Sequence, residues 1–514
     1  MAEREWREAS DMRQSVITLV IIVAVAALLR FVALGSGIPF NIGVDEPEIM
    51  DRAVRMMKTG DFNPHFFDYP GLYFYVQLAV ACLRFLAGAT SGEWTSLDQV
   101  NPADFYLWGR AVTAFLGTAT VVLVYLIGMR WGTRSAALAA GLMAVMPLHV
   151  RESHYVLTDV PATFFVALAL LLTLRAHERE RAPDFAWAGA AAGLAAATKY
   201  PGAIALLLPL IAVWMTLGTK PSRLVGSLAV LAGFGAAFLI AAPYTLLDLP
   251  AFLNGYAHLA GYYASKELGE PAGVTYYKHL SRSLEWPAFL LLLTGLGLGA
   301  VRAVRGPGRV RWTITIVFPI VYFYFLSGQT LVYGRYLLPL LPFVCVLAAA
   351  GCVSGVSLLR RFDIPRAART VIIAAVTIAA VLPPAWKSLN FMRDHARIST
   401  VEQAHAWVLD NIPKGASIVV ETQALVLSRS FNAKNVPQLV MDFRAPQEYQ
   451  DYVDAGVQYI VASSQKFGDP MEMPHKNPQL YNAYMRLFEQ AHEVARFTPS
   501  GDHPGPELRI YKLK

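Results

Sequence analysis

The chain has 514 residues, of which 55% are hydrophobic and only 16% are charged. Because soluble globular proteins carry about a quarter charged residues, this composition excludes a soluble globule and predicts an integral membrane protein. The formal net charge of +7 does not indicate a nucleic-acid partner, since most arginines lie in short clusters between apolar runs, as in the cytoplasmic loops of membrane proteins.

The first apolar run covers roughly residues 16–34. Small residues near its end resemble a signal-peptide cleavage site. Its length nevertheless approaches the ~20 residues of a membrane-spanning helix. We therefore interpret this run as a retained helix.

Two neighbouring acids, Asp45 and Glu46, follow this first run directly. Pro47 is a good first helical residue, and a helix from there to about Lys58 would have one apolar and one charged face, as helices on a bilayer surface do. The two carboxylates are candidates for a general base and its orienting partner, because transfer to a hydroxyl requires removal of a proton. Helix capping at the membrane edge is the alternative interpretation.

Further apolar runs follow, each near the length needed to cross a bilayer. They lie at roughly 70–88, 107–129, 134–149, 158–176, 185–199, 201–217, 223–246, 286–304, 312–327, 334–355 and 368–387. Arginine and lysine clusters between them, such as those at 130–134, 175–181 and 220–223, indicate cytoplasmic loops.

If every run crossed the membrane, the arginines at 130–134 would lie outside. The conflict disappears if the run at 70–88, which opens with Pro70-Gly71 and contains Arg84, lies along the membrane surface instead. The sequence then predicts a polytopic α-helical membrane protein with about eleven membrane-spanning helices and outer juxtamembrane helices. Its N-terminus would be cytoplasmic and its C-terminal domain extracytoplasmic.

Under this topology three single cations, Arg110, Lys199 and Arg335, lie at the outer ends of apolar runs. One interpretation is that they extend to lipid headgroups. The other is that they hold a phosphate, where each charge-assisted hydrogen bond contributes about 1.5–3 kcal/mol. Polar segments distant in sequence converge on this outer face, which favours an active site there.

The stretch from Arg151 to Pro161 contains further candidates, His154 and Asp159. If it is helical, Arg151, Tyr155 and Asp159 share one face. Asp159 also lies two residues before Pro161, so capping of the next helix is as good an interpretation as catalysis. His154 alone is more typical of a hydrogen-bonded interface residue than of a metal ligand.

The composition changes near residue 389 to that of a soluble α/β unit, so we divide the chain into domains at 1–388 and 389–514. A helix is expected near 400–410, and strands are expected at 418–421, 439–441, 458–462 and 508–511. Cys345 and Cys352 are about 10 Å apart along one predicted helix, too far for a disulfide. No cysteine-based zinc site follows.

Five motifs together resemble glycosyltransferase family 39 of the GT-C superfold, which includes protein O-mannosyltransferases and lipid A aminoarabinose transferases. The motifs are Asp45-Glu46, the segment from Asn63 to Pro70, His154-Tyr-Val-Leu-Thr-Asp159, Gly193 to Pro201, and Arg335-Tyr336-Leu-Leu-Pro. The segment from Gly456 to Tyr459 also resembles the outer domain of this family. One departure is that Tyr69 stands where aminoarabinose transferases carry a lysine, which counts against that donor.

The resemblance implies an inverting glycosyltransferase of the bacterial cytoplasmic (inner) membrane. It would move a sugar from a polyprenyl-phosphate donor to a hydroxyl acceptor, which is a protein, a lipid or a glycan. By analogy Asp45 would be the base or an acid that orients the acceptor, Glu46 its partner, and Asp159 a second acid lining the cavity. Lys199, Arg335 and Arg110 would stabilise the departing lipid phosphate. Tyr69, His154 and Tyr336 lie in the same motifs and are included as substrate-binding candidates.

The resemblance implies no required cofactor, although paired acids are able to bind Mg²⁺ or Mn²⁺. The expected partners are the lipid-linked donor, the acceptor and membrane lipids. The alternative function is a transporter or flippase of an isoprenoid-linked sugar, in which ionisable groups usually lie near the middle of the bilayer. A third hypothesis is a non-catalytic subunit whose outer domain binds a partner protein.

Overall fold

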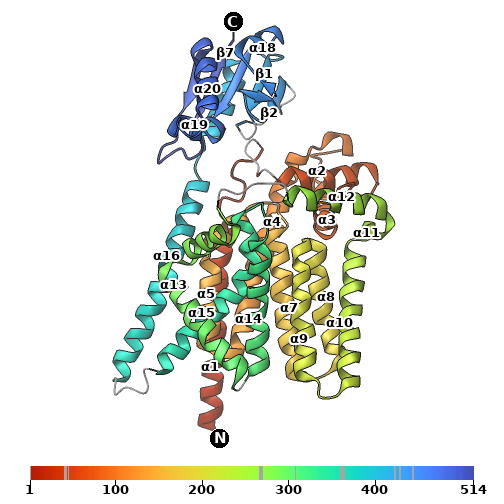
Figure 1. Ribbon diagram of the computed structural model, residues 1–514, viewed down its shortest axis with the longest axis vertical. Helices are drawn as coiled ribbons and strands as arrows, with labels where there is room; N and C mark the ends of the chain where they lie inside the picture. Colours follow the sequence, from red (N-terminus) through yellow and green to blue (C-terminus); the bar gives the residue numbers. More distant parts are fainter. Residues whose placement is uncertain are drawn as a thin grey trace. The chain divides into compact units, whose positions relative to one another are not determined.

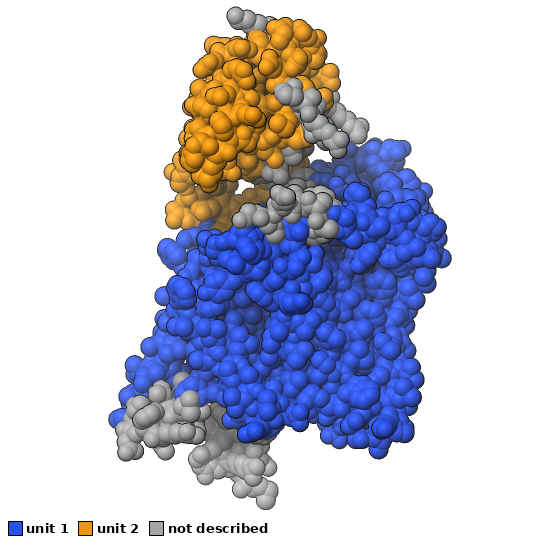
Figure 2. Space-filling model, viewed as in Figure 1, with its two compact units in different colours: residues 1–34, 45–390 blue, residues 35–44, 391–514 orange. Residues whose placement is uncertain are grey.

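The computed structural model describes residues 2–39, 43, 45–264, 270–306, 308–358, 365–421, 424–425, 427, 430–442 and 445–513. The chain divides into two compact units, one of residues 1–34 and 45–390 and one of residues 35–44 and 391–514 (Figure 2). The sequence placed the boundary at 388/389.

The first unit is helical throughout its described part (Figure 1). Its elements before the middle of the unit are α1 (Ala2–Phe31), α2 (Glu46–Thr59), α3 (Leu72–Thr90), η1 (Leu97–Gln99), η2 (Pro102–Asp104), α4 (Tyr106–Gly128), η3 (Met129–Trp131), α5 (Thr133–Val145), α6 (Pro147–Glu152), α7 (Asp159–Arg179) and α8 (Ala182–Thr198). They continue with η4 (Tyr200–Leu206), α9 (Leu207–Thr216), α10 (Lys220–Ala241), α11 (Tyr244–Leu247), α12 (Leu249–Ala264), α13 (Ala272–Val304), α14 (Arg309–Ser327), η5 (Gly334–Leu340), α15 (Leu341–Leu358) and α16 (Arg366–His395).

Nine helices of the described chain are long and apolar enough to cross a membrane. Each of the nine overlaps an apolar run expected from the sequence, and the predicted fold class is confirmed. The runs expected at 134–149, 185–199 and 201–217 form helical segments of fewer than 18 residues and are not among the nine, whereas about eleven crossings were expected. By length and composition α3 is one of these nine helices. The expectation that the run at 70–88 lies along the membrane surface therefore stays a prediction. The structure places α3 against α2, and Figure 1 shows α2, α3 and α12 gathered at one end of the α7, α8 and α10 bundle.

Helix α2 forms where the sequence predicted a surface helix. Pro47 lies in its first turn, and Gly60 ends it with a left-handed backbone (φ 72°) and an N–H that donates to the carbonyl of Met56. A left-handed residue at this position is the usual helix terminus. The helix buries an apolar face that includes Ile49 and Ala53, and this face fixes the position of Asp45 at its N-terminal end.

Helices α8 and α10 pack closely because glycines lie at their contact. A Cβ added to Gly193 of α8 would meet the carbonyl oxygen of Phe234 in α10 at 2.3 Å, and Gly189 has an equivalent contact with Val230 at 2.2 Å. Small residues of this kind allow membrane helices to approach backbone to backbone. Because α8 ends directly before Lys199, this contact also helps to position Lys199.

Replacing Gly193 with Ala should therefore destabilise the protein. The new methyl group would meet backbone rather than a flexible side chain, so the helices must separate, at a typical overpacking cost of about 1–3 kcal/mol. Thermal unfolding in detergent measures the effect. The matched control is Gly235 of α10, where a Cβ would meet nothing within 4 Å, and where Ala should be neutral or slightly stabilising because it favours helix. Equal effects at both positions would contradict this account.

The second unit is an α/β domain. Its elements are α17 (Thr400–Asn411), β1 (Ser417–Glu421), β2 (Asn432–Val436), β3 (Met441–Asp442), β4 (Ala445–Pro446), α18 (Tyr449–Asp454), β5 (Tyr459–Ser463), α19 (Ser464–Glu472), α20 (Pro478–Gln490), β6 (His492–Phe497) and β7 (Leu508–Lys512). The main sheet has the order β2-β1-β5-β7-β6, in which β1 is parallel to both β2 and β5, whereas β7 is antiparallel to its neighbours.

Alternating side chains on the strands bury both faces of this sheet. Val419 faces a core that includes Tyr452 and Tyr484, whereas Ile418 and Val420 face a core with Val401 of α17. This is the period of two that a strand imposes. At the end of β1 the buried carboxylate of Glu421 accepts hydrogen bonds from the backbone of Leu439 and Ser463 and from the Tyr484 hydroxyl.

The sequence located three strands of this domain correctly, at β1, β5 and β7. The strand expected at 439–441 is wrong for the most part, because the short strand β3 begins only at Met441. Three strands, β2, the two-residue β4 and β6, were missed. Four of the five β2 residues are exposed, and it carries polar side chains such as Asn432 and Lys434, so an edge position in the sheet left no apolar signal to read.

Candidate active site

Four charged side chains from four separate segments form one continuous ion network. Arg335 of η5 donates to Asp45 with an Nη2 to Oδ2 distance of 2.5 Å, and Lys199 donates to Asp159 with an Nζ to Oδ1 distance of 2.5 Å. Arg335 also lies between the two acids, since its Nε is 3.8 Å from Asp159 Oδ2. We call Asp45, Asp159, Lys199 and Arg335 the ion network.

The ion network lies where helices begin and end. Asp45 precedes α2, Asp159 is the first residue of α7, Lys199 directly follows α8, and Arg335 lies at the start of η5 before α15. Helix α8 ends at Thr198, and Lys199 has an extended backbone (φ −154°, ψ 127°). The α-helix does not continue through Pro201, because proline has no N–H to donate to the carbonyl four residues earlier and its ring would clash with that carbonyl. Since α7 begins and α8 ends at the same level, the network lies at one end of the bundle rather than in its middle.

The structure does not support the capping and headgroup interpretations of these residues. Asp45 occupies the N-cap position of α2 but makes no side-chain capping bond, and Asp159 lies inside α7, whose N-cap is Thr158. Both acids contact cations instead of capping. Lys199 and Arg335 do not extend away to headgroups, since their side chains are only 11% and 19% exposed and both pair with acids.

Aromatic rings hold the two cations from the other side. The ammonium of Lys199 is 4.3 Å from the centre of the Tyr336 ring, and the guanidinium of Arg335 is 4.7 Å from the centre of the Tyr333 ring. Cations over aromatic faces gain electrostatic attraction, most strongly where water is excluded. The rings and acids together fix both cations in place before any substrate arrives.

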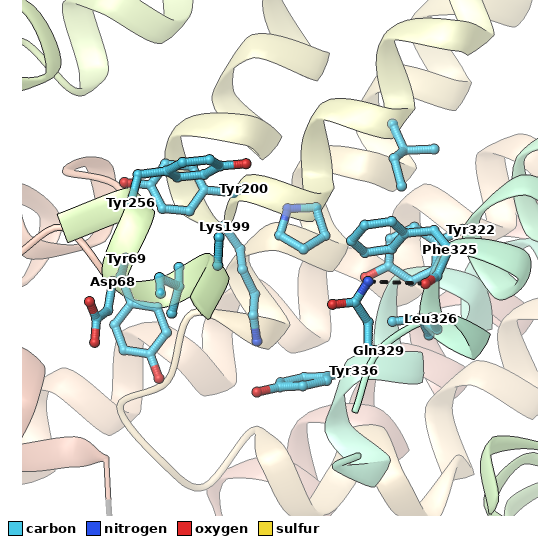
Figure 3. Close-up of a pocket in the computed structure, with 14 residues that line it drawn as sticks. Asp68, Tyr69, Lys199, Tyr200, Tyr256, Tyr322, Phe325, Leu326, Gln329 and Tyr336 are labelled. Atoms are coloured by element: carbon cyan, nitrogen blue, oxygen red, sulfur yellow. Dashed lines mark hydrogen bonds between the residues drawn. The ribbon is translucent and has the colours of Figure 1, made fainter. Parts of the chain in front are cut away.

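A cavity of about 350 Å³ opens beside the ion network (Figure 3). Its lining combines polar and aromatic side chains with an apolar wall, and consists of Asp68, Tyr69, Lys199, Tyr200, Pro201, Ile204, Tyr256, Leu259, Ala260, Tyr322, Phe325, Leu326, Gln329 and Tyr336. Figure 3 shows the Tyr336 ring just below the Lys199 ammonium and the Tyr69 ring to the left of it. Lys199 belongs both to the lining and to the ion network, so it connects the two.

Of the predicted substrate-binding residues, Tyr69, Lys199 and Tyr336 line this cavity. Asp45, Asp159 and Arg335 are not among its lining residues and lie behind it, joined to it through Lys199. Asp45 keeps 25% of its side chain exposed, whereas Asp159 keeps only 4%. Asp45 is therefore the more accessible of the two acids.

Glu46 and Arg110 form a separate, fully buried ion pair. The guanidinium of Arg110 donates through Nε and Nη2 to both carboxylate oxygens of Glu46, at 2.8 and 2.7 Å, and also to the carbonyl of Leu34. Glu46 additionally accepts from the backbone N–H of Val156 at 2.8 Å. Both side chains are 0% exposed.

This arrangement does not support direct substrate contact by Glu46 or Arg110. The Arg110 guanidinium is committed to a carboxylate inside the protein, so a phosphate would have to break a buried pair to reach it. The pair instead ties α4 to the start of α2 and to the segment before α7. Because Glu46 directly follows Asp45 in the chain, the pair also restrains the backbone next to Asp45.

His154 also lies inside the protein rather than in the cavity. Its Nδ1 is 2.9 Å from the carbonyl of Val150 and its Nε2 is 3.1 Å from the carbonyl of Val32, and the residue is 0% exposed. The expected shared face of Arg151, Tyr155 and Asp159 is wrong, because α6 ends at Glu152 and α7 begins only at Asp159. His154 has a structural role in this break between helices.

Several cavity residues were not singled out from the sequence. Asp68 precedes Tyr69 in the motif that carried the resemblance, and its position there was the available signal. Burial raises the pKa of the Asp68 carboxyl, although His258 and Arg52 oppose the shift. Tyr256 belongs to α12, and no local sequence pattern indicated that this helix lies against the cavity.

Within the described residues, no group of three or more His, Cys, Asp or Glu side chains is arranged to hold a metal ion. The two acids of the ion network, Asp45 and Asp159, are each paired with a cation instead. The expectation that no divalent cation is required therefore stays a prediction. Activity in the presence of EDTA tests it.

Comparison with known proteins identifies the class of fold. The family described as dolichyl-phosphate-mannose-protein mannosyltransferase matches residues 55–263, which is less than half of the chain. No curated protein matches the sequence.

Two solved structures resemble the chain over nearly its whole length. The apo oligosaccharyltransferase of Archaeoglobus fulgidus has a TM-score of 0.57 at 13% identity, and the match covers 97% of this chain and 74% of that one. ArnT from Cupriavidus metallidurans, bound to undecaprenyl phosphate, has a TM-score of 0.53 at 15% identity, and the match covers 96% of this chain and 97% of that one.

The chain is thus a multi-pass membrane protein with the GT-C superfold of glycosyltransferases. The resemblance recognised from Asp45-Glu46 and the later motifs is confirmed at the level of this superfold.

Proposed function

We propose that this protein is an inverting glycosyltransferase that moves a sugar from a polyprenyl-phosphate donor to a hydroxyl acceptor at the outer face of the bacterial cytoplasmic membrane. The observation that carries the proposal is the ion network placed directly against the cavity, with Lys199 common to both. This arrangement provides a place for an anionic leaving group beside an accessible carboxylate. The similar structure of ArnT with undecaprenyl phosphate supports the same class of donor.

The donor phosphate would bind at the Lys199 end of the cavity. The Lys199 ammonium and the hydroxyls of Tyr69 and Tyr336 supply hydrogen-bond donors there, and charge-assisted bonds to phosphate are the strong ones. The apolar wall, which includes Leu259 and Leu326, suits the first isoprene units of the lipid. A cavity of about 350 Å³ is at the small end of the range for ligand sites, which is roughly 300–1,000 Å³.

The reaction would be a single displacement. The acceptor oxygen forms a bond to the anomeric carbon while the bond from that carbon to the phosphate oxygen breaks, so the configuration inverts. The hydroxyl proton passes to the carboxylate of Asp45, and polyprenyl phosphate departs with the electron pair of the broken bond. Asp45 suits the role of base better than Asp159 because its side chain is more exposed, at 25% against 4%.

Positioning and electrostatics would provide most of the rate enhancement. Phosphate is a good leaving group without protonation, so fixed positive charge near its oxygens is the main requirement. Arg335 and Lys199 are already oriented by Asp45, Asp159 and the aromatic rings, and preorganised charges need no rearrangement as the reaction proceeds.

Replacing Lys199 with Gln should weaken donor binding. Loss of one charge-assisted hydrogen bond of about 1.5–3 kcal/mol corresponds to a rise in the donor KM of about 10- to 100-fold. Steady-state kinetics with varied donor measures this. The control Lys414→Gln changes an exposed lysine of the second unit and should leave KM unaltered. An unchanged KM in the Lys199 variant would show that the donor phosphate does not bind at this end of the cavity.

The function itself is tested with pure protein, a panel of radiolabelled polyprenyl-phosphate sugars and a membrane extract that supplies acceptors. Transfer of label to a protein, lipid or glycan supports the proposal and identifies the acceptor class. Movement of the labelled donor across liposome membranes without transfer would favour a transporter instead. No observation in the described residues or the comparisons favours that alternative.

A further inference from the structure

Helix α12 forms one wall of the cavity although little of it is buried. It contributes Tyr256, Leu259 and Ala260 to the lining. Within residues 249–261, where burial is described, no side chain is buried. A helix without a buried face is not held by a hydrophobic core, so its position depends on a small number of individual contacts.

Aromatic side chains provide the apolar part of these contacts. The rings of Phe67 and Phe252 meet edge to face with centres 5.9 Å apart, and Tyr256 meets Tyr200 at 5.5 Å. The Tyr200 hydroxyl donates to the carbonyl of Phe67 at 2.9 Å. Gly255 lies close against Phe67, since a Cβ added there would meet the Phe67 Cβ at 2.9 Å.

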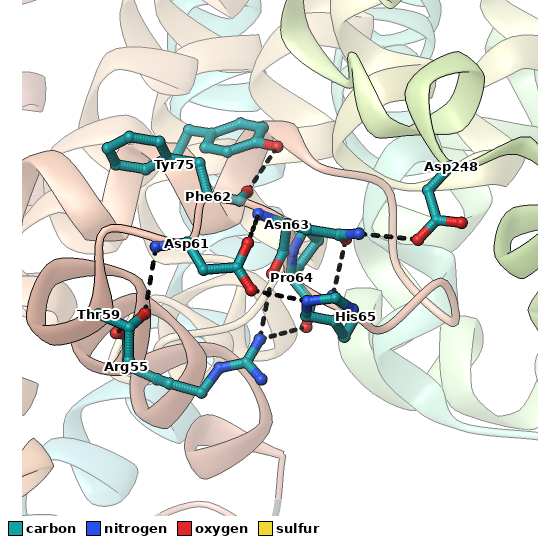
Figure 4. Close-up of polar contacts among 9 residues, drawn as sticks. All are labelled: Arg55, Thr59, Asp61, Phe62, Asn63, Pro64, His65, Tyr75 and Asp248. Atoms are coloured by element: carbon teal, nitrogen blue, oxygen red, sulfur yellow. Dashed lines mark hydrogen bonds and ion pairs between the residues drawn. The ribbon is translucent and has the colours of Figure 1, made fainter.

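A polar bond between described residues adds to them at the start of α12. The Asn63 amide donates through Nδ2 to Asp248 Oδ2 at 2.7 Å (Figure 4). Asp248 ends α11, and its carbonyl accepts the N–H of Phe252 in the first turn of α12. The bond therefore joins the α2–α3 loop to the residue from which α12 begins.

Asn63 is held rigidly in its loop, which makes it a preorganised partner. Its N–H donates to Asp61 Oδ1, its Oδ1 accepts the N–H of His65, and its carbonyl accepts from Arg55 (Figure 4). The residue is only 7% exposed. Little freedom remains for Asn63 to lose when Asp248 docks against it, so most of the bond energy is available for positioning α12.

We propose that Asn63 and Asp248 are positioning residues that dock α12 against the α2–α3 loop. The same loop supplies Asp68 and Tyr69 to the cavity, so this bond fixes the separation between two of its walls. With α12 undocked the cavity would lose its Tyr256 wall. The consequence for donor affinity rests on the proposed function, whereas the docking itself does not.

Four variants separate the bond from other effects of substitution. Asp248→Ala removes the acceptor, and Asn63→Asp places two carboxylates together. Asp248→Asn keeps a neutral bond, because the new amide oxygen still accepts from Asn63. The swapped double variant N63D/D248N restores the bond with donor and acceptor reversed. The carboxylate at position 63 also still accepts the N–H of His65, so the loop keeps that contact. Asp98→Ala changes an exposed acid elsewhere in the unit and serves as control.

The first readout needs no substrate: amide hydrogen exchange of residues 249–264 in detergent. We expect faster exchange in Asp248→Ala and Asn63→Asp, and exchange like the native protein in Asp248→Asn, N63D/D248N and Asp98→Ala. Two results would overturn the docking role: unchanged hydrogen exchange in the two disruptive variants, or failure of N63D/D248N to restore protection. This readout decides the proposal even if the protein transfers no sugar.

The second readout is kinetic. Asp248→Ala and Asn63→Asp should raise the donor KM about 10-fold with kcat changed less than about 2-fold, because the reacting groups of the ion network are untouched. N63D/D248N should return KM to the native value. A loss confined to kcat would contradict the positioning of a binding wall. Absence of transfer with every donor would count against the proposed function alone.

Discussion

Replacing Asp45 with Asn is expected to abolish sugar transfer while the protein stays folded. The amide keeps the size of the side chain but cannot take the acceptor proton at neutral pH, and a positioned general base contributes about 10²- to 10⁴-fold to the rate. The change therefore predicts a fall in kcat of about that size, measured with saturating donor and acceptor. Thermal unfolding in detergent shows whether the fold is kept.

The matched control is Glu48→Gln, which changes an exposed carboxylate two residues into α2 that pairs with Arg52 outside the ion network. It should retain near-native activity. Because Asp45 also pairs with Arg335, binding of polyprenyl phosphate is measured in parallel. Full activity in the Asp45 variant refutes its role as base, and a loss of binding with kcat preserved would assign Asp45 to holding Arg335 instead.

Replacing Arg110 with Met is expected to cause the largest loss of stability. The change leaves the Glu46 carboxylate buried without its cation, and breaking a buried ion pair in this way costs about 3–5 kcal/mol. Denaturant or thermal unfolding of the detergent-solubilised protein measures the loss. Activity should fall with it, because Glu46 is the first residue of α2 and its displacement moves Asp45.

Two further variants test whether the buried charge is the cause. Adding Glu46→Gln to Arg110→Met removes the unpaired charge and should recover much of the stability, which a double-mutant cycle quantifies. Arg130→Met makes the same substitution in a pair whose Glu178 partner is 48% exposed, where a loss of only about 1 kcal/mol is expected. An equal loss for Arg110→Met and Arg130→Met would show that burial of the pair is unimportant.

The membrane part of the fold was readable from sequence because its signal is local. A run of apolar residues of spanning length needs no partner to be recognised, and the candidate spans lie on those runs. Helix α12 and the first part of α13 lie between two expected runs and were not recognised as helices. In the second unit the buried strands β1, β5 and β7 were found for the same reason. The exposed edge strand β2 was not, because an edge strand with polar side chains carries no such signal.

The candidate site was found only in part. Convergence of polar segments on one end of the bundle correctly brought together Asp45, Asp159, Lys199 and Arg335. The sequence did not distinguish these residues from Glu46 and Arg110, which lie in the same segments but form a buried pair of their own. Adjacent residues such as Asp45 and Glu46 point in different directions from a helix start, so their proximity in sequence says nothing about which one joins the ion network.

Composition and the lengths of the apolar runs were enough to recognise an integral membrane protein, and the positions of the arginine and lysine clusters indicated the end of the bundle at which the polar segments meet. The partner of each polar group could not be read from the chain: Asp45 pairs with Arg335 across 290 positions, Glu46 with Arg110 across 64, and Asn63 with Asp248 across 185. An ion pair or hydrogen bond acts over a few ångströms between groups whose separation along the chain is arbitrary, so helix packing selects which donor meets which acceptor.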